Sequence, residues 1–327
     1  MKALICRRYS GYQDLEVGDF PDPTPGPGEI LIDVEAAGLN FPDLLIVEGK
    51  YQFRPELPFV PGGECAGRVA AVGEGVERLR IGDRVVGTAI SGAFAEKMVV
   101  PESAATPIPD GMDTDRAAGI TITYATSYYA LRDRAKLQPG ETLLVLGAAG
   151  GVGLAAVELG KALGATVIAA ASTEEKLAAA EAAGADLRIL YTEEPLKERV
   201  KELTNHQGAD VIFDPVGGAF SEQAFRAIAW EGRHLVVGFA AGDISKIPLN
   251  LALLKSAQIV GVFWGAWTQR EPEASVRGQL ELKTMFEQGR LEPRVTAMPL
   301  ERYRDAYEML ADRRVIGKVV LQMASHT

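Results

Sequence analysis

The chain has 327 residues, of which 47% are hydrophobic, and a formal net charge of -10 at pH 7. This length suits about two domains of ordinary size, and the negative charge disfavours nucleic acid or an anionic membrane surface as a partner. The apolar runs are too interrupted for a membrane span, the N-terminus becomes charged too early for a signal peptide, and two cysteines make no disulfide framework, so we expect a cytoplasmic protein.

The first part of the chain predicts a mostly β domain. Short strand-like runs separated by proline and glycine cover residues 29–36, 67–72, 84–87 and 94–100. Such spacing with turn residues between the runs is typical of a compact β unit. We expect this unit to occupy residues 1–119.

From about residue 120 helix-like and strand-like segments alternate. After a strand at 143–146, the expected strands are 166–171, 187–191, 211–214 and 234–238, and the expected helices are 154–163, 174–183, 196–204 and 221–230. This alternation predicts a doubly wound parallel sheet with helices on both faces. The second domain is therefore expected at residues 120–260.

The last part of the chain is too short for a domain of its own. It predicts helices at 273–288 and 300–311 and a final strand at 318–322. We expect residues 261–327 to return and complete the first domain, which leaves a cleft between the two domains for a small molecule.

A glycine-rich turn follows the first strand of the alternating part. Ala148-x-Gly150-x-x-Gly153 matches the dinucleotide-binding fingerprint, with alanine in place of the first glycine. Gly150 would let the backbone approach a pyrophosphate, and Gly153 would let helix and strand pack closely. Glycine-rich turns also close ordinary strand-to-helix connections. The expected pyrophosphate-binding residues are Ala149, Gly150, Gly151, Val152 and Gly153.

The end of the second strand distinguishes the two nicotinamide dinucleotides. An acidic residue there would bind the ribose 2′-hydroxyl, but this chain has Ser172. Thr173 and Lys176 add a hydroxyl and a cation, which favours NADPH. Glu174 and Glu175 argue against it, although at the start of a helix they could complement its dipole and face solvent.

Further motifs follow one another along nearly the whole chain. They are Pro25–Glu29, Gly38–Asp43, Pro58–Gly62, Gly82–Val85, the turn Gly147–Gly153 and Gly317–Val320. In this order they resemble the medium-chain dehydrogenase/reductase superfamily and, within it, its zinc-free quinone oxidoreductase branch. The resemblance implies an α/β protein with a GroES-like, mostly β catalytic domain and a Rossmann cofactor domain, commonly as a dimer.

The residues predict no metal site, because a catalytic zinc needs about three protein ligands. Zinc-dependent relatives have a histidine where this chain has Gly63, and a cysteine near the position of Asn40, where this chain has none. Their lobe of four cysteines is also missing. Asp43 and Glu64 remain, which are too few. The three histidines do not cluster, and each is expected at the surface or a helix end: His206, His234 and His326.

Without a metal the substrate must already be electrophilic, such as a quinone or an α,β-unsaturated carbonyl compound. The nicotinamide would supply a hydride, and the oxygen that gains charge would need a donor and a proton. The resemblance assigns proton donation to Tyr51 and a place near nicotinamide and substrate to Asn40. Packing of Tyr51 on nearby prolines and a turn at Asn40 are the structural alternatives.

The resemblance extends to residues further along the chain. It places Tyr191 at the adenine-ribose end and Lys318 near the phosphates, although Tyr191 could be a core aromatic and Lys318 a solvated side chain. Val216, Gly238 and Phe239 follow two later strands, so their loops should line the cofactor cleft at the carboxyl edge of the sheet.

The sequence thus predicts a zinc-free, NADPH-dependent reductase of quinones or α,β-unsaturated carbonyl compounds, with Tyr51 or water as the proton source, and a homodimer. Two alternatives remain. One is an NADPH-dependent enoyl-thioester (acyl-CoA) reductase, for which Lys50, Arg54 and Arg270 offer cations. The other is an NADPH-binding protein without meaningful turnover.

Overall fold

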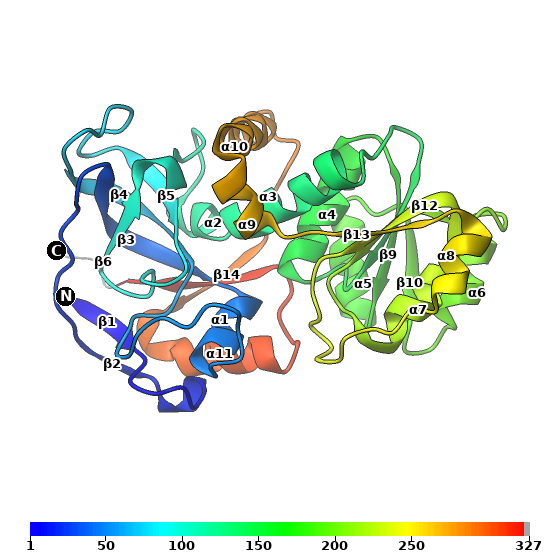
Figure 1. Ribbon diagram of the computed structural model, residues 1–327, viewed down its shortest axis with the longest axis horizontal. Coiled ribbons are helices and arrows are strands. Elements are labelled where there is room, and N and C mark those ends of the chain that lie inside the picture. The colour runs from blue at the N-terminus through cyan, green and yellow to red at the C-terminus, as the bar shows by residue number, and fades with distance from the viewer. Residues whose placement is uncertain (324–327) are drawn as a thin grey trace. The chain divides into compact units, whose positions relative to one another are not determined.

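The computed structural model describes residues 1–323. Its chain divides into two compact units (Figure 1). The first is Met1–Ile122 together with Pro293–Thr327, and the second is Thr123–Glu292.

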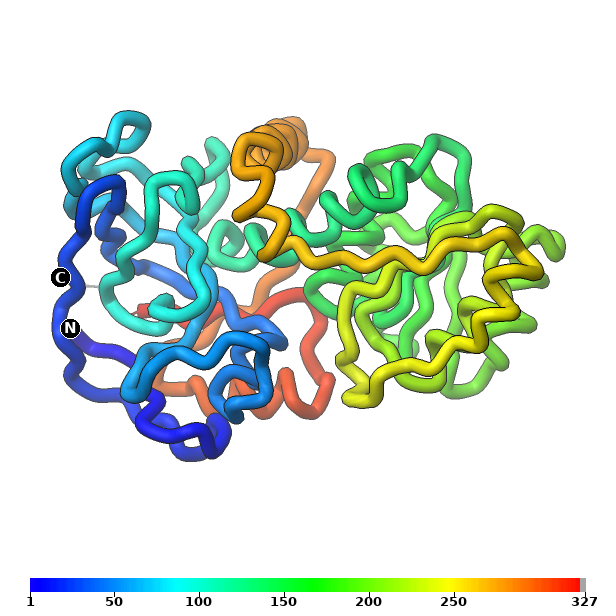
Figure 2. The backbone as a smooth tube through the Cα atoms, viewed as in Figure 1, coloured from blue at the N-terminus to red at the C-terminus, as the bar shows by residue number. Residues whose placement is uncertain are grey.

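The first unit is built on a seven-stranded sheet of order β14-β15-β3-β4-β5-β7, in which β6 also pairs with β3. Its strands are β3 (Glu29–Leu39), β4 (Glu64–Val72), β5 (Arg84–Thr88), β6 (Lys97–Pro101), β7 (Ala105–Pro107), β14 (Val295–Pro299) and β15 (Lys318–Gln322); β1 (Lys2–Ile5) and β2 (Glu16–Asp19) form a second sheet. Figure 2 shows β15 beside β3, and the two pair antiparallel with Val319 opposite Leu39. The last described strand therefore lies inside the first unit's sheet.

The core of this unit follows the strand period. Ile30, Ile32 and Val34 alternate along β3 and are all buried, as expected when one face of a strand packs on the core. They belong to one cluster with Phe94 and Tyr307. Short helices complete the unit: α1 (Phe41–Val47), α2 (Thr114–Ala118) and α11 (Tyr303–Ala311).

The second unit has a six-stranded parallel sheet of order β10-β9-β8-β11-β12-β13. Its strands are β8 (Thr142–Leu146), β9 (Thr166–Ala171), β10 (Leu187–Leu190), β11 (Ala209–Asp214), β12 (Ile228–Val236) and β13 (Gln258–Gly261). Its helices are α4 (Gly151–Ala162), α5 (Glu174–Ala182), α6 (Leu196–Leu203), α7 (Gly218–Arg226), α8 (Leu249–Lys255), α9 (Trp264–Arg270) and α10 (Pro272–Glu287); α3 (Thr121–Tyr128) begins just before the unit. The strand order reverses between β8 and β11, which is the switch point of a doubly wound sheet. The expected fold class, a mostly β unit plus a doubly wound α/β unit, is confirmed.

The second unit also contains residues 261–292, which the sequence assigned to the first. The reason is aromatic packing within the unit. Trp267 of α9 stacks on Tyr129 with ring centroids 4.4 Å apart, and Phe286 of α10 packs edge-on against Tyr124 at 5.1 Å.

One predicted helix is partly wrong. The helix expected at 221–230 ends with α7 at Arg226, and β12 starts at Ile228. The apolar residues before Trp230 continue a helical pattern, but Ile228 pairs with Ala209 of β11 and the chain is a strand there.

Among residues 1–323 no helix has the length and apolar character needed to cross a membrane.

Candidate cofactor and catalytic sites

The turn between β8 and α4 uses its glycines in different ways. Gly147 has φ 58, a left-handed conformation, so the tight turn falls there and Ala148 is tolerated. A Cβ on Gly153 would lie 2.2 Å from the Gly147 carbonyl oxygen, so helix and strand pack too closely for a side chain. A Cβ on Gly150 would meet only that oxygen, at 3.5 Å. Packing does not require glycine at 150, and the approach of a pyrophosphate to its backbone at the N-terminus of α4 stays a prediction.

The loops that follow β11 and β12 lie against this turn. A Cβ on Gly147 would come within 2.9 Å of Val216 Cγ2, and one on Gly238 within 3.3 Å of the Pro215 carbonyl oxygen. Phe239 is half-exposed in the same loop as Gly238. The structure therefore brings Val216, Gly238 and Phe239 together at the carboxyl edge of the sheet.

A buried polar network supports the loop after β11. One Asp214 oxygen accepts hydrogen bonds from the backbone N–H groups of Val216 and Gly217, each at 2.9 Å. The other lies 3.1 Å from His234 Nε2 and accepts from the Ser221 hydroxyl. Burial raises the pKa of Asp214, but His234 and the hydrogen bonds outweigh burial and hold that pKa below its usual value.

His234 corrects the sequence analysis, which expected it at the surface or a helix end. It lies on β12 with only 1% of its surface exposed. Sequence reasoning missed its pairing with Asp214 because adjacent strands, rather than neighbouring residues, bring the two together. His206 is exposed just after α6, as expected. His326 lies outside the described residues.

Hydroxyls and an ammonium group gather at the end of β9. Lys176 Nζ donates to Ser172 Oγ at 3.1 Å, and the Thr173 hydroxyl, which caps α5, accepts from the Lys176 backbone N–H at 3.3 Å. Glu174 forms an ion pair with Arg188 at 2.9 Å. One of the two carboxylates that argued against NADPH is therefore paired with a cation.

Tyr191 directly follows β10 and is half-buried. Its ring packs on Phe220 with centroids 4.4 Å apart, and its backbone N–H donates to the Ala171 carbonyl at 3.2 Å. These contacts account for an aromatic residue at this strand end. A contact with the adenine-ribose end of a cofactor stays a prediction.

In the first unit, Asn40, Glu64 and Lys318 form a buried cluster. Lys318 Nζ donates to Asn40 Oδ1 and to Glu64 Oε1, the latter at 2.5 Å. Asn40 Nδ2 donates to Glu64 Oε1 at 2.9 Å and to the Gly38 carbonyl at 3.3 Å, and Glu64 Oε2 accepts from the Ile122 N–H at 2.9 Å. Lys318 belongs to this cluster in the first unit, and its expected place near the phosphates stays a prediction.

Asp43 and Tyr51 lie on and after helix α1. The Asp43 carboxylate accepts from the Asn40 N–H at 2.7 Å, and burial raises the pKa of Asp43 to about 7. Tyr51 is half-buried against the core and lies 6.2 Å from Phe53, measured between ring centroids. Burial, with the Asp43 charge, raises the pKa of Tyr51, so its hydroxyl keeps the proton that a donor needs.

No group of three or more His, Cys, Asp or Glu side chains in the described part of the chain is arranged to hold a metal ion. The cysteines Cys6 and Cys65 are free and buried. Burial raises the pKa of Cys65 to about 12, so this residue is a buried protonated thiol and not a reactive thiolate.

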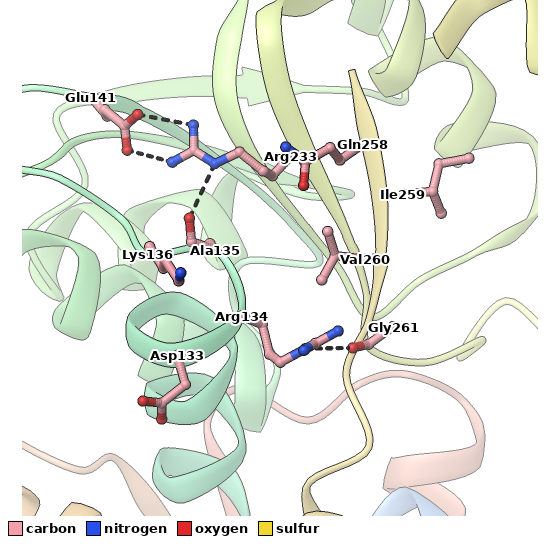
Figure 3. Close-up of a pocket in the computed structure, with 10 residues that line it drawn as sticks. All are labelled: Asp133, Arg134, Ala135, Lys136, Glu141, Arg233, Gln258, Ile259, Val260 and Gly261. Carbon is pink, nitrogen blue, oxygen red and sulfur yellow. Dashed lines mark hydrogen bonds and ion pairs between the residues drawn. The ribbon is translucent and has the colours of Figure 1, made fainter. Parts of the chain in front are cut away.

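A cavity of about 660 Å³ lies in the second unit (Figure 3). Within it Arg233 pairs with Glu141 at 2.7 Å and donates to the Ala135 carbonyl at 3.1 Å. Glu141 precedes β8 and Gln258 begins β13, which are amino-terminal positions of the strands. None of the predicted site residues lines this cavity, so it is separate from the glycine turn at the carboxyl ends.

Two family models match the chain. The model described as alcohol dehydrogenase GroES-like domain matches residues 26–110, and the model described as zinc-binding dehydrogenase matches residues 151–277. The chain is 39% identical to the quinone oxidoreductase-like protein 2 homolog of Nematostella vectensis, over 98% of this chain and 88% of that protein. It is 35% identical to a quinone oxidoreductase of Pseudomonas aeruginosa, over 98% of this chain and 99% of that one.

Solved structures give the same likeness. The structure of Escherichia coli quinone oxidoreductase in complex with NADPH is 30% identical, with a TM-score of 0.92 over 98% of this chain and all (100%) of that one. A mycobacterial protein in complex with NADPH is 32% identical, with a TM-score of 0.92 and the same coverage of 98% and 100%.

Proposed function

Because the chain belongs to the quinone oxidoreductase branch of the medium-chain dehydrogenase/reductase superfamily, we propose that it is a zinc-independent, NADPH-dependent reductase of quinones or α,β-unsaturated carbonyl compounds. The observation that carries the proposal is the carboxyl edge of the second unit's sheet. The turn at this edge has room at Gly150, and the next strand is followed by Ser172, Thr173 and Lys176. This set of residues suits a dinucleotide with an extra phosphate.

The chain's residues divide the binding of NADPH between them. The backbone from Ala149 to Gly153, at the start of α4, would hold the pyrophosphate. Ser172, Thr173 and Lys176 would hold the 2′-phosphate, for which hydroxyls and an ammonium group are suitable partners. The loops with Val216, Gly238 and Phe239 complete the binding edge. Bound NADPH supplies the hydride.

Tyr51 completes the reduction with a proton. In the reduction of an enone or a quinone the substrate oxygen would become negative, and Tyr51 or water would donate a hydrogen bond and then a proton to it. Solvent returns the proton to Tyr51. Asn40 has both amide hydrogens engaged by Gly38 and Glu64, so its contact with substrate stays a prediction.

The structure gives an enoyl-thioester reductase no added support. Of the cations that could face a carrier's phosphates, Lys50 pairs with Glu48 at 2.9 Å and Arg270 donates to the Ala266 carbonyl at 3.3 Å. The quinone or enone substrate therefore remains the proposal.

We further propose that the protein is a cytoplasmic homodimer, joined through β13 and α8. The β13 strand ends the parallel sheet, so within residues 1–323 no strand pairs with its outer side, and its sequence carries no charge. Beside it Leu249, Leu253 and Leu254 of α8 are largely exposed. A second copy that covers this apolar face would pair the strand edge as well. Buried, free Cys6 and Cys65 suit a reducing compartment.

The test measures the loss of reduced-nicotinamide absorbance with NADPH, then with NADH, against a quinone, a cyclic enone, an enal and an enoyl-CoA. We expect NADPH-dependent reduction of the quinone or the enone. Turnover of the enoyl-CoA alone would replace the substrate class, and NADPH binding with no oxidation would favour a binding protein. Lys176→Met should weaken the binding of NADPH and leave that of NADH unchanged.

A further inference from the structure

We propose that Lys318 is a positioning residue that fixes the Asn40 amide and thereby helix α1, and that it does not bind the cofactor phosphates. This proposal rests on the reductase proposed above, because its effect on turnover needs that reaction. Lys318 and Glu64 are 5% and 1% exposed, so the pair is sealed from solvent. An ammonium group held there with two acceptors would have to break both contacts to reach a phosphate.

Two glycines let the backbone pack closely around the pair. A Cβ on Gly119 would lie 3.0 Å from Lys318 Cγ, and one on Gly38 would lie 2.7 Å from Glu64 Oε1 and 2.4 Å from the Ala118 carbonyl oxygen. A side chain at Gly38 would overlap these atoms, and one at Gly119 would fit only if Lys318 gave way. The lysine stem therefore packs closely against Gly119 and the carboxylate against Gly38, which limits the movement of both.

This confinement gives the Asn40 amide one orientation. Its oxygen faces an ammonium group, which can only donate, and its nitrogen faces a carboxylate oxygen of Glu64, which accepts. A flipped amide would set N–H groups against Lys318 and oxygen against Glu64. Lys318 thus selects the orientation that both neighbours can satisfy.

The fixed residue is the one at which α1 begins. Asn40 is the N-cap, and its N–H is bound by Asp43 in the first turn of the helix. After the helix ends at Val47, the N–H of Lys50 returns to the Leu45 carbonyl at 2.8 Å, one residue before Tyr51. A displaced Asn40 would therefore shift the segment that carries the proposed proton donor.

The test is the double variant Lys318→Met/Glu64→Gln, which removes both charges of the ion pair, so that neither is left without its partner. We expect its kcat to fall by roughly 100-fold, as small displacements near reacting groups do. The Kd for NADPH, followed by nicotinamide fluorescence, should stay within about twofold of wild type. Lys176→Met is the matched control, with a Kd raised by about tenfold or more through the loss of a charged hydrogen bond.

A second measurement needs no turnover. In wild type the Asn40 side-chain amide, assigned by its loss in Asn40→Asp, should show two resolved NMR signals protected from solvent exchange, and in the double variant this protection should be lost. If the double variant raises the Kd for NADPH as much as Lys176→Met does, Lys318 is a phosphate ligand and the proposal is overturned. Unchanged amide protection would also overturn it, because Lys318 would then not fix the Asn40 amide. If wild type reduces none of the acceptors, the proposed function fails, but the Kd and the amide signals still decide the role of Lys318.

Discussion

Two glycines of the turn after β8 illustrate how one residue type serves packing at one position and a ligand at another. A Cβ on Gly153 would overlap the Gly147 carbonyl oxygen at 2.2 Å, whereas at Gly150 the same oxygen would be an ordinary neighbour at 3.5 Å. Gly150 also has φ -74, which alanine adopts without strain.

Alanine should therefore act differently at the two positions. Gly153→Ala is expected to lower the free energy of unfolding by about 1–3 kcal/mol, as overpacking does. Gly150→Ala should unfold at the urea concentration of wild type and bind NADPH more weakly, because its methyl group takes the room left for the pyrophosphate. Urea titration and NADPH titration separate the two effects, and equal loss of stability would contradict this division.

Tyr51→Phe tests proton donation. Loss of a general acid lowers turnover by about 10²–10⁴-fold, so we expect kcat to fall by a factor in that range. If water can donate the proton instead, the loss of kcat should be smaller. The Kd for NADPH should stay at the wild-type value. Tyr12→Phe is the control, because Tyr12 stacks on Tyr307 with centroids 5.4 Å apart and has no role in the proposed reaction. An unchanged kcat in Tyr51→Phe would assign the proton to water.

At the scale of elements, helix α4 carries a buried carboxyl group that should make stability depend on pH. Glu158 accepts from the Tyr124 hydroxyl and the Glu292 N–H, each at 3.0 Å, and burial raises its pKa from 4.5 to about 7. The folded state therefore keeps the Glu158 carboxyl group protonated up to about pH 7, whereas the unfolded chain releases this proton near pH 4.5. The folded state binds more protons in this window, so the stability contributed by Glu158 falls as the pH rises through it.

Glu158→Gln removes this dependence. The free energy of unfolding of the variant minus that of wild type should increase by about 2–3 kcal/mol from pH 5 to pH 8, because a pKa shift of this order implies a change of that size. Urea unfolding of both proteins at the two pH values measures it. A constant difference between them would show that Glu158 is ionised throughout.

The sequence predicted elements wherever a local pattern decides them. Strand β9 matches its expected range because buried alanine, valine and isoleucine lie between a glycine end and a helix cap. Helix α1 was missed although Asn40, Pro42 and Asp43 are an N-cap, a first-turn proline and an N3 acid, which are sufficient start signals. The predicted end of α7 was too late in the chain. The pairing of β12 with β11 decides where the helix ends, and no local pattern reveals that pairing.

For the whole molecule, the prediction concerns association. If β13 and α8 form the dimer contact, Leu253→Asp, at a side chain 79% exposed, should yield monomers in sedimentation experiments at micromolar concentration. A charge buried without a partner strongly disfavours an interface. Ile81→Asp, at a side chain 67% exposed in the first unit, should stay dimeric. A monomeric wild type would refute the homodimer.

Candidate site residues were predictable only where the chain keeps them close in sequence. Ser172, Thr173 and Lys176 share one strand end and helix start, and the structure joins them. Lys318 and Asn40 are 278 positions apart, and strand pairing between β15 and β3 brings them into contact. Such a contact depends on sheet topology and register, so the motif at 317–320 could not reveal it.

The position of β15 has a consequence for biosynthesis. Strand β3 leaves the ribosome early, but its neighbour β15 follows only after the second unit has been translated. Domains fold as units while the chain grows, at about 5–20 residues per second, so the second unit can finish first. Until β15 arrives, residues 36–39 of β3 lack β15 as their partner strand, and Glu64 lacks the ammonium group of Lys318. We therefore expect nascent chains at this stage to be more prone to strand-edge association than the complete chain.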